Sequence, residues 1–119
     1  MKFKKNQEIV CVNNLEMEGI LVVGQTYLVD KYTSLMTGDI VQLFGVKIQL
    51  SPSRFLPIGH KNELEIMSLY YKVRELDSEI EECFNIEALT GVDHYWKREK
   101  LRGQIDDIEQ DINNLREDV

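Results

Sequence analysis

The chain has 119 residues, of which 43% are hydrophobic and 29% charged, and its formal net charge is −7. This length fits one domain or a small module with an appendage, and the acidic balance argues against a general nucleic-acid coat protein, which needs an excess of Lys and Arg. Because no run approaches about 18 apolar residues and no apolar segment follows the first lysines, we expect a cytoplasmic protein without a membrane span or signal peptide.

The chain divides into two chemically different parts near residues 57–60. Residues 1–58 carry six basic and five acidic residues, whereas residues 59–119 carry eight basic and sixteen acidic residues and no proline. Such a shift in composition marks a boundary between structural units. We therefore expect an α+β protein, with a small β-domain at 1–58 and a helical appendage at 59–119.

Short β-rich runs separated by turn residues fill the first part. The expected strands are 8–13, 25–32, 39–43 and 46–50, followed by one helical turn at 51–54 and a closing strand at 55–57. Phe44-Gly45 predicts a tight hairpin, and Val46, Ile48 and Leu50 alternate with polar residues, as on a strand with one buried face. Five short strands of this kind predict a small SH3-like β-barrel, because closure removes exposed strand edges.

Two apolar seams with heptad-like spacing predict two helices in the second part. The first seam comprises Ile66, Leu69, Val73, Leu76, Ile80 and Cys83, and the second comprises Leu101, Ile105, Ile108, Ile112, Leu115 and Val119. We place the break between the helices around 85–91, with Thr90 and Asp93 as a capping box at the start of the second helix. The seams predict an antiparallel helical hairpin. Because such a hairpin leaves one side of each helix open, we expect a homo-oligomer.

Motifs for catalysis are nearly absent from the sequence. It has no glycine-rich phosphate loop and no glycine-flanked serine elbow, and His60 and His94 are its only histidines. Cys11 and Cys83 lie far apart without metal-ligand spacing, so we interpret both as buried free thiols. The carboxylates lie on helix faces that we expect to be solvated. We therefore expect no enzyme, no metal site and no cofactor.

One basic cluster stands out in the acidic second part. Lys97, Arg98, Lys100 and Arg102 fall within six positions, directly after Tyr95 and Trp96, the only tryptophan. Arg98 and Arg102 are four residues apart and share a helix face, so a bound anion would relieve their repulsion. Guanidinium forks match phosphate oxygens, and rings such as Trp96, Tyr71 and Phe84 stack on nucleobases. The cluster indicates a site for a nucleotide-derived ligand.

A purely structural role is the alternative for each of these residues. Arg98 and Arg102 would then pair with glutamates across the hairpin, at Glu79, Glu81, Glu82 or Glu87, and the aromatic side chains would pack on the barrel. Arg54 is held near the barrel rim by its neighbour Phe55, where it either pairs with an acid or reaches a ligand at a subunit junction.

Three segments carry a family resemblance: Ile9–Val12, Val23–Val29 and Ser51–Phe55. They resemble the small β-barrel of bacteriophage accessory proteins, in which a V-C-V strand precedes V-G-K-T-Y-x-V and S-x-R-F, although Gln25 replaces the usual lysine. A barrel followed by two long helices is similar, more particularly, to the phage Thoeris anti-defence sponge proteins.

That resemblance implies a non-enzymatic protein of the host cytoplasm. It would sequester cyclic ADP-ribose isomers and, as some members do, cyclic oligonucleotides, in pockets at the junctions of a dimer or of an assembly of dimers. The resemblance implies that Arg98 and Arg102 hold the ligand, that Tyr71 or Phe84 stacks on it, and that Arg54 serves a second pocket.

Two other functions stay open. The acidic helices would suit a protein-binding inhibitor or adaptor that acts on a host protein. An SH3-like module that contacts nucleic acid through Lys2, Lys4, Lys5 and Lys47 ranks last, because residues 1–58 have a net charge of only +1.

Overall fold

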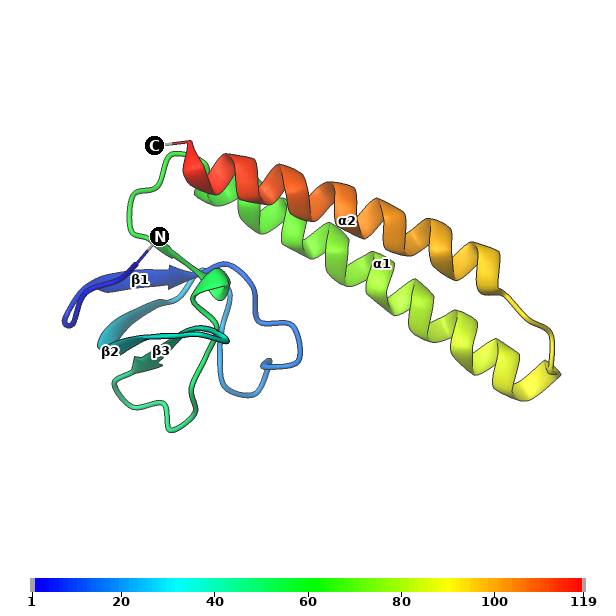
Figure 1. Cartoon of the computed structure of the whole chain (residues 1–119), viewed down its shortest axis with the longest axis horizontal. Coiled ribbons are helices and arrows are strands. Elements are labelled where there is room, and N and C mark those ends of the chain that lie inside the picture. The colour runs from blue at the N-terminus through cyan, green and yellow to red at the C-terminus, as the bar shows by residue number, and fades with distance from the viewer. Residues whose placement is uncertain (1, 119) are drawn as a thin grey trace. The chain divides into compact units, whose positions relative to one another are not determined.

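The computed structural model describes residues 2–118 and has an α+β architecture, in which a four-stranded antiparallel sheet precedes two helices (Figure 1). The elements are β1 (Glu8–Cys11), β2 (Thr26–Leu35), β3 (Gly38–Leu43), a 3-10 turn (Pro52–Arg54), β4 (Phe55–Pro57), α1 (Glu63–Thr90) and α2 (Tyr95–Glu117). The described chain forms two compact units, 2–67 and 68–118. Neither helix within 2–118 is long and apolar enough to cross a membrane.

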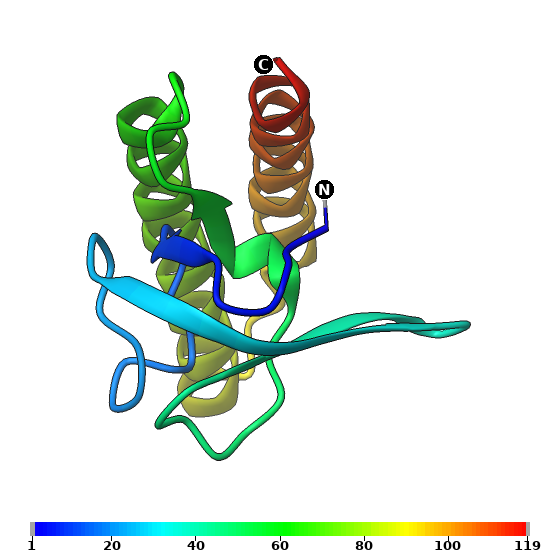
Figure 2. The ribbon, with the colours of Figure 1, turned by 90° about the vertical axis from the view of Figure 1, so that its left-hand side faces the viewer.

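The sheet has the strand order β3-β2-β1-β4, and β2 is its longest strand. The first part of β2 pairs with β1, and the remainder pairs with β3, with an irregularity in register between Val29 and Lys31. An extra residue at such a point bends a strand and increases its twist. The β2–β3 hairpin is correspondingly twisted in Figure 2.

Three expectations for the first part need correction. The sheet is not closed, because β3 and β4 lie at its opposite edges, so a complete barrel is not confirmed. Residues 46–50 do not form the expected strand; only Leu50 pairs, in a single bridge to Val41. The tight hairpin joins β2 to β3, whereas the expected hairpin turn was at Phe44-Gly45. Val46 and Ile48 pack on the core from an irregular segment. Their alternation with polar residues therefore reflects this packing and not pairing in a strand.

The core of the N-terminal unit draws apolar side chains from every strand. Its fully buried members include Ile9, Cys11, Leu21, Val29, Val41 and Phe55. The Phe55 ring meets the Tyr27 ring edge to face, with centroids 6.2 Å apart. Cys11 is a buried free thiol, as expected, and burial raises its pKa, which keeps it protonated and unreactive.

The helical hairpin is confirmed: α1 and α2 run side by side and antiparallel in Figures 1 and 2. Seam residues of both helices share one buried cluster, formed by Ile80, Cys83 and Leu101 with Leu76 and Ile105 packed against it. These five residues of the two seams therefore face each other within one chain, and Val119, the last residue of the second seam, lies outside the described residues. Cys83 is buried there as a free thiol.

The expected break between the helices was placed too early. Helix α1 continues through Thr90, and the connection is residues 91–94. Gly91 has φ 72°, the left-handed conformation that commonly terminates a helix. The predicted capping box is also wrong, because the Thr90 hydroxyl donates to the Ile86 carbonyl inside α1. An Asp93 carboxylate oxygen instead accepts the N–H of Tyr95 at 2.8 Å.

Candidate functional site

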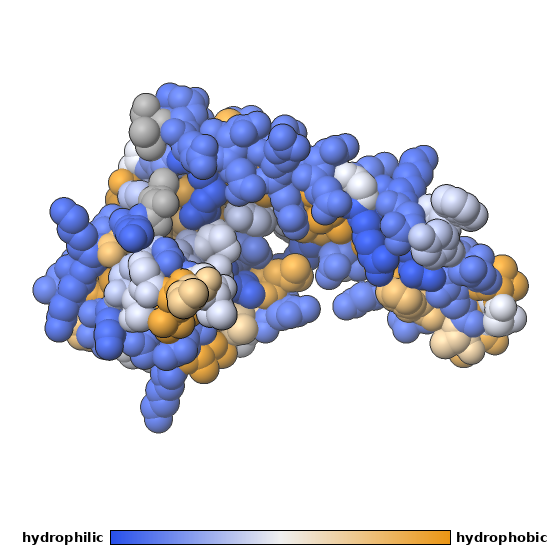
Figure 3. Space-filling view, viewed as in Figure 1, coloured by the Kyte–Doolittle hydropathy of each residue, from blue (hydrophilic) through white to orange (hydrophobic). Residues whose placement is uncertain are grey.

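Apolar and aromatic side chains gather around the connection between α1 and α2. We call this region, residues 84–102, the hairpin tip. Leu89 is 86% exposed and Trp96 is 82% exposed. Phe84, Val92 and Tyr95 are also among the exposed large hydrophobic residues. Figure 3 shows apolar surface at this end of the hairpin, whereas the visible surface along α2 is mostly hydrophilic. The hairpin tip is therefore an exposed apolar patch at one end of the hairpin.

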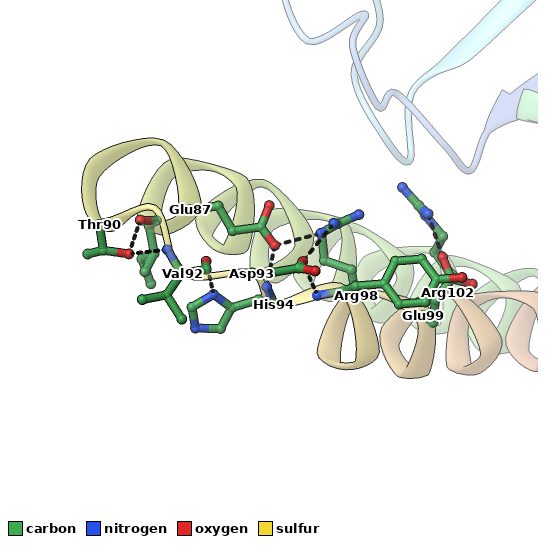
Figure 4. Close-up of polar contacts among 10 residues, drawn as sticks. Glu87, Thr90, Val92, Asp93, His94, Arg98, Glu99 and Arg102 are labelled. Atoms are coloured by element: carbon green, nitrogen blue, oxygen red, sulfur yellow. Dashed lines mark hydrogen bonds and ion pairs between the residues drawn. The ribbon is translucent and has the colours of Figure 1, made fainter.

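Glu87 organises the tip by accepting two hydrogen bonds on one oxygen (Figure 4). Its Oε1 accepts the backbone N–H of His94 at 2.6 Å and the Nε–H of Arg98 at 3.0 Å. The pKa of Glu87 is lowered, mainly because the His94 N–H bonds the charged carboxylate, with Arg98 adding to the effect. These bonds join the end of α1 to the connection and to α2, so the exposed side chains stand on an ordered frame.

Arg98 lies between carboxylates and aromatic rings. Its guanidinium carbon is 4.4 Å from the centroid of the Phe84 ring and 5.8 Å from that of Tyr95. Its NH2 nitrogen is 3.7 Å from Asp93, and the side chain is only 13% exposed. Arg98 of α2 thus contacts an aromatic ring of α1, that of Phe84. The guanidinium is nevertheless held by Glu87, not left free for a phosphate.

Arg102 is also paired. Its NH1 donates to Glu99 Oε1 at 2.8 Å, and both side chains are largely exposed. Each guanidinium of the proposed phosphate site thus has a glutamate partner, as the structural alternative expected for Arg98. An anion site at these arginines requires guanidiniums without carboxylate partners, and the structure does not show that. Residues three apart on a helix are neighbours, so Glu99 reaches Arg102 within α2 itself.

The remaining residues of the predicted ligand site do not all lie together. The Trp96 ring packs edge to face on Tyr95, with centroids 5.3 Å apart, and lies at the tip with Phe84 and Arg98. Tyr71 is 62% exposed on α1, thirteen positions before Phe84. That separation corresponds to about 20 Å along a helix. A single chain therefore does not place Tyr71 and the hairpin tip around one small ligand.

Arg54 belongs to the N-terminal unit and holds a loop. Its NH1 donates to the carbonyl of Leu15 at 2.8 Å and to that of Asn13 at 3.3 Å. Both carbonyls belong to the connection between β1 and β2. Arg54 therefore satisfies backbone acceptors of its own unit, which differs from both sequence expectations, an acidic partner or a ligand.

Sequence reasoning missed Leu89 and Val92 as parts of the tip and gave Glu87 no particular role in it. Leu89 and Val92 fall outside the heptad seams, and apolar residues beside a glycine at a helix end are a signal that went unused. Glu87 appeared only as one of several partners for an arginine, and its bond to the His94 backbone depends on where α1 ends. A helix that ends before Thr90 does not bring Glu87 next to the His94 backbone, so the bond could not be predicted from the expected helix boundary.

Metal ligands and the two histidines are the remaining candidates for a functional site. Residues 2–118 contain no group of three or more His, Cys, Asp or Glu side chains that could hold a metal ion. The His94 ring nitrogen Nδ1 lies 3.1 Å from the Val92 carbonyl, and His60 Nδ1 accepts the Asn62 N–H, so both rings contact local backbone. No protein family matches this chain, and no curated protein or solved structure matches it either.

Proposed function

We propose that this chain is a non-catalytic binding protein that docks a partner protein through the hairpin tip. The observation that carries the proposal is the exposure of Leu89 and Trp96 on a frame ordered by Glu87. Tryptophan, tyrosine and arginine dominate the energetics of protein interfaces. A frame that is already ordered reduces the conformational entropy lost on binding.

The charges of the hairpin tip and of the flanking helix segments indicate which kind of partner surface the tip would bind. Residues 84–102 carry four basic and three acidic residues, whereas 63–83 and 103–118 each have a net charge of −5. Within residues 2–118, Lys97 and Lys100 have no carboxylate partner. The acidic flanks repel an acidic partner and leave the tip as the favoured contact. The partner is therefore a protein surface with an apolar pocket bordered by Asp or Glu.

Affinity capture with matched variants tests this proposal. The purified chain is immobilised, and proteins bound from a cell extract are quantified for the wild type, Leu89→Asp, Trp96→Ala and Tyr71→Ala. Tyr71→Ala is the control, because it removes an exposed ring from the same hairpin outside the tip. We expect a stoichiometric partner that both tip variants lose and Tyr71→Ala retains. Absence of such a partner, or its retention by both tip variants, contradicts the proposal.

Sequestration of a cyclic nucleotide, as the Thoeris sponge resemblance implies, is the second candidate. It is favoured by Trp96, Lys97 and Lys100, which offer a ring for stacking and two ammonium groups for phosphates. Arg98 and Arg102 would have to exchange Glu87 and Glu99 for the ligand, which opposes binding. Cytoplasmic location would give the protein access to such a signal.

Calorimetry with cyclic ADP-ribose and with a cyclic dinucleotide separates the two candidates. Sequestration predicts binding that Trp96→Ala and Lys100→Glu weaken, and release of intact ligand after heating, detected by chromatography. A junction between subunits that includes Tyr71 predicts that Tyr71→Ala weakens binding as well. Absence of binding discards sequestration, and a degraded ligand indicates an enzyme.

Self-association through the helices is part of the same proposal. Leu69, Ile105, Ile108 and Leu115 of the seams are only half-buried within the chain. A second copy of the hairpin offers a matching apolar face, as helical bundles require. Light scattering is expected to give at least a dimer for the wild type and a lower mass for Ile108→Asp. A monomeric wild type contradicts self-association.

For the N-terminal unit we propose an SH3-like half-barrel. Three features support it: the bend in β2 that lets it serve two parts of the sheet, the bridge from Val41 to Leu50 beyond β3, and the 3-10 turn directly before β4. An experimental structure with additional pairing between 44–50 and β3 would support the assignment, and a flat open sheet would contradict it.

A further inference from the structure

The N-terminal unit contains a shallow pocket of about 370 Å³ that none of the functions above uses. Two segments line it: Gly19 and Ile20 from the β1–β2 connection, and Gly45, Val46, Lys47 and Ile48 after β3. Its volume lies in the range of small-ligand and side-chain pockets, about 300–1,000 Å³. The pocket therefore has room for one large side chain and the backbone that carries it.

The pocket walls combine apolar side chains with exposed backbone at two glycines. Ile20 is 46% exposed, although it lies among apolar residues. A Cβ placed on Gly19 or Gly45 would meet no atom within 4 Å, so the space above both glycines is open. A bound chain can therefore approach the backbone of both segments closely.

The second wall also offers unused backbone groups. Val46 donates its N–H to Leu43, but within residues 2–118 the amides of Gly45, Lys47, Ile48 and Gln49 have no hydrogen-bond partner. The carbonyls of residues 45–49 likewise accept no hydrogen bond from the described chain. An added peptide strand pairs with free backbone donors and acceptors of this kind, and its side chains enter an adjacent pocket.

One positive charge marks the pocket. Lys47 is the only charged lining residue, and it has no carboxylate partner within residues 2–118. We propose that this pocket binds an extended peptide segment of a partner protein, with an apolar side chain between Ile20 and Ile48 and an adjacent carboxylate on Lys47. This site is separate in the sequence from the hairpin tip and does not depend on it.

A random peptide library displayed on phage, selected against the purified full-length chain, tests the proposal. We expect enriched peptides in which an aliphatic or aromatic residue lies next to Asp or Glu. Gly19→Val should fill the pocket without strain, because Gly19 is outside the left-handed region and its Cβ position is open. It should weaken binding of the enriched peptide by about tenfold or more, a loss of about 1.4 kcal/mol.

Two further variants keep the test decisive. Lys47→Glu reverses the marked charge on an exposed side chain and should weaken binding to a similar degree, while Lys31→Glu, an exposed lysine of β2, should not. Trp96→Ala should also bind normally, which separates this site from the hairpin tip. The proposal is overturned if no such motif is enriched, or if peptides bind Gly19→Val and Lys47→Glu as well as they bind the wild type.

Discussion

The N-terminal unit and the helical hairpin bury their apolar side chains to different degrees. In the first, a bent sheet and its connections surround Phe55, Ile9 and Leu21 so completely that none is exposed. In the second, Ile80 and Leu101 each remain 7% exposed, and Leu76 and Ile105 are only half-buried. A bent sheet with connections packed against it encloses a side chain, whereas two helices meet along one seam. The hairpin core around Ile80 and Leu101 is therefore less completely enclosed than the core of the N-terminal unit.

The largest expected effect on stability comes from truncating one core side chain in each of the two units. Phe55→Ala should lower the free energy of unfolding by about 3–5 kcal/mol, because it leaves a cavity in an enclosed site. Leu101→Ala should lower the free energy of unfolding by about 2 kcal/mol, because the seam is less enclosed and a smaller cavity remains. Urea denaturation followed by circular dichroism measures both values. Equal losses would contradict the difference between the two regions.

Arg54 tests how the N-terminal unit holds its longest connection. Arg54→Ala removes two charge-assisted hydrogen bonds to the Asn13 and Leu15 carbonyls, which should cost about 2 kcal/mol. Amide exchange in residues 12–25 should rise in this variant. Lys31→Ala, which removes an exposed cation of the same unit, is the control. Unchanged exchange in Arg54→Ala would show that the loop does not depend on the arginine.

Glu87 tests whether the tip frame is electrostatic. Its pKa is lowered in the folded chain, so its stabilising effect is complete above its ordinary value of 4.5 and is lost as the pH falls through the lowered value. Emission from Trp96, the only tryptophan, should change over that acid range. Glu87→Gln should abolish this acid-dependent step. The same acid transition in both proteins would assign it to other carboxylates.

Tyr32 of β2 gives the smallest and most local expected effect, in the N-terminal unit. Burial, and a 2.6 Å hydrogen bond donated to Asp39, raise the pKa of Tyr32 to about 12. Because the ordinary value is 10.0, the stabilisation it contributes is complete below pH 10 and declines as the pH rises towards 12. Phenolate absorbance should show one ionisation near pH 12 that is absent from Tyr32→Phe. Identical titration curves would contradict this environment.

The secondary structure was largely predictable because its signals are local. The short β-rich runs of β1 and β3, the Ser-Pro pair before a 3-10 turn and the two seams each depend on residues close in the chain. The Ser51 hydroxyl, for example, accepts the Ser53 N–H and begins the turn that was expected at 51–54. The pairing of the seams within one hairpin also follows from their similar lengths.

The partners of charged side chains were decided only by the tertiary structure. Glu87 meets Arg98 because α1 continues to Thr90 and Gly91 then reverses the chain, and Arg54 reaches carbonyls 39 and 41 residues earlier in the sequence. Neither pairing has a local signature, since a long flexible side chain pairs with whichever acceptor the fold brings near. The sequence by itself determined most of the helical and extended segments, except residues 46–50 and the end of α1. Which cations remain available for a partner was determined by the fold, because that depends on distances between residues far apart in the chain.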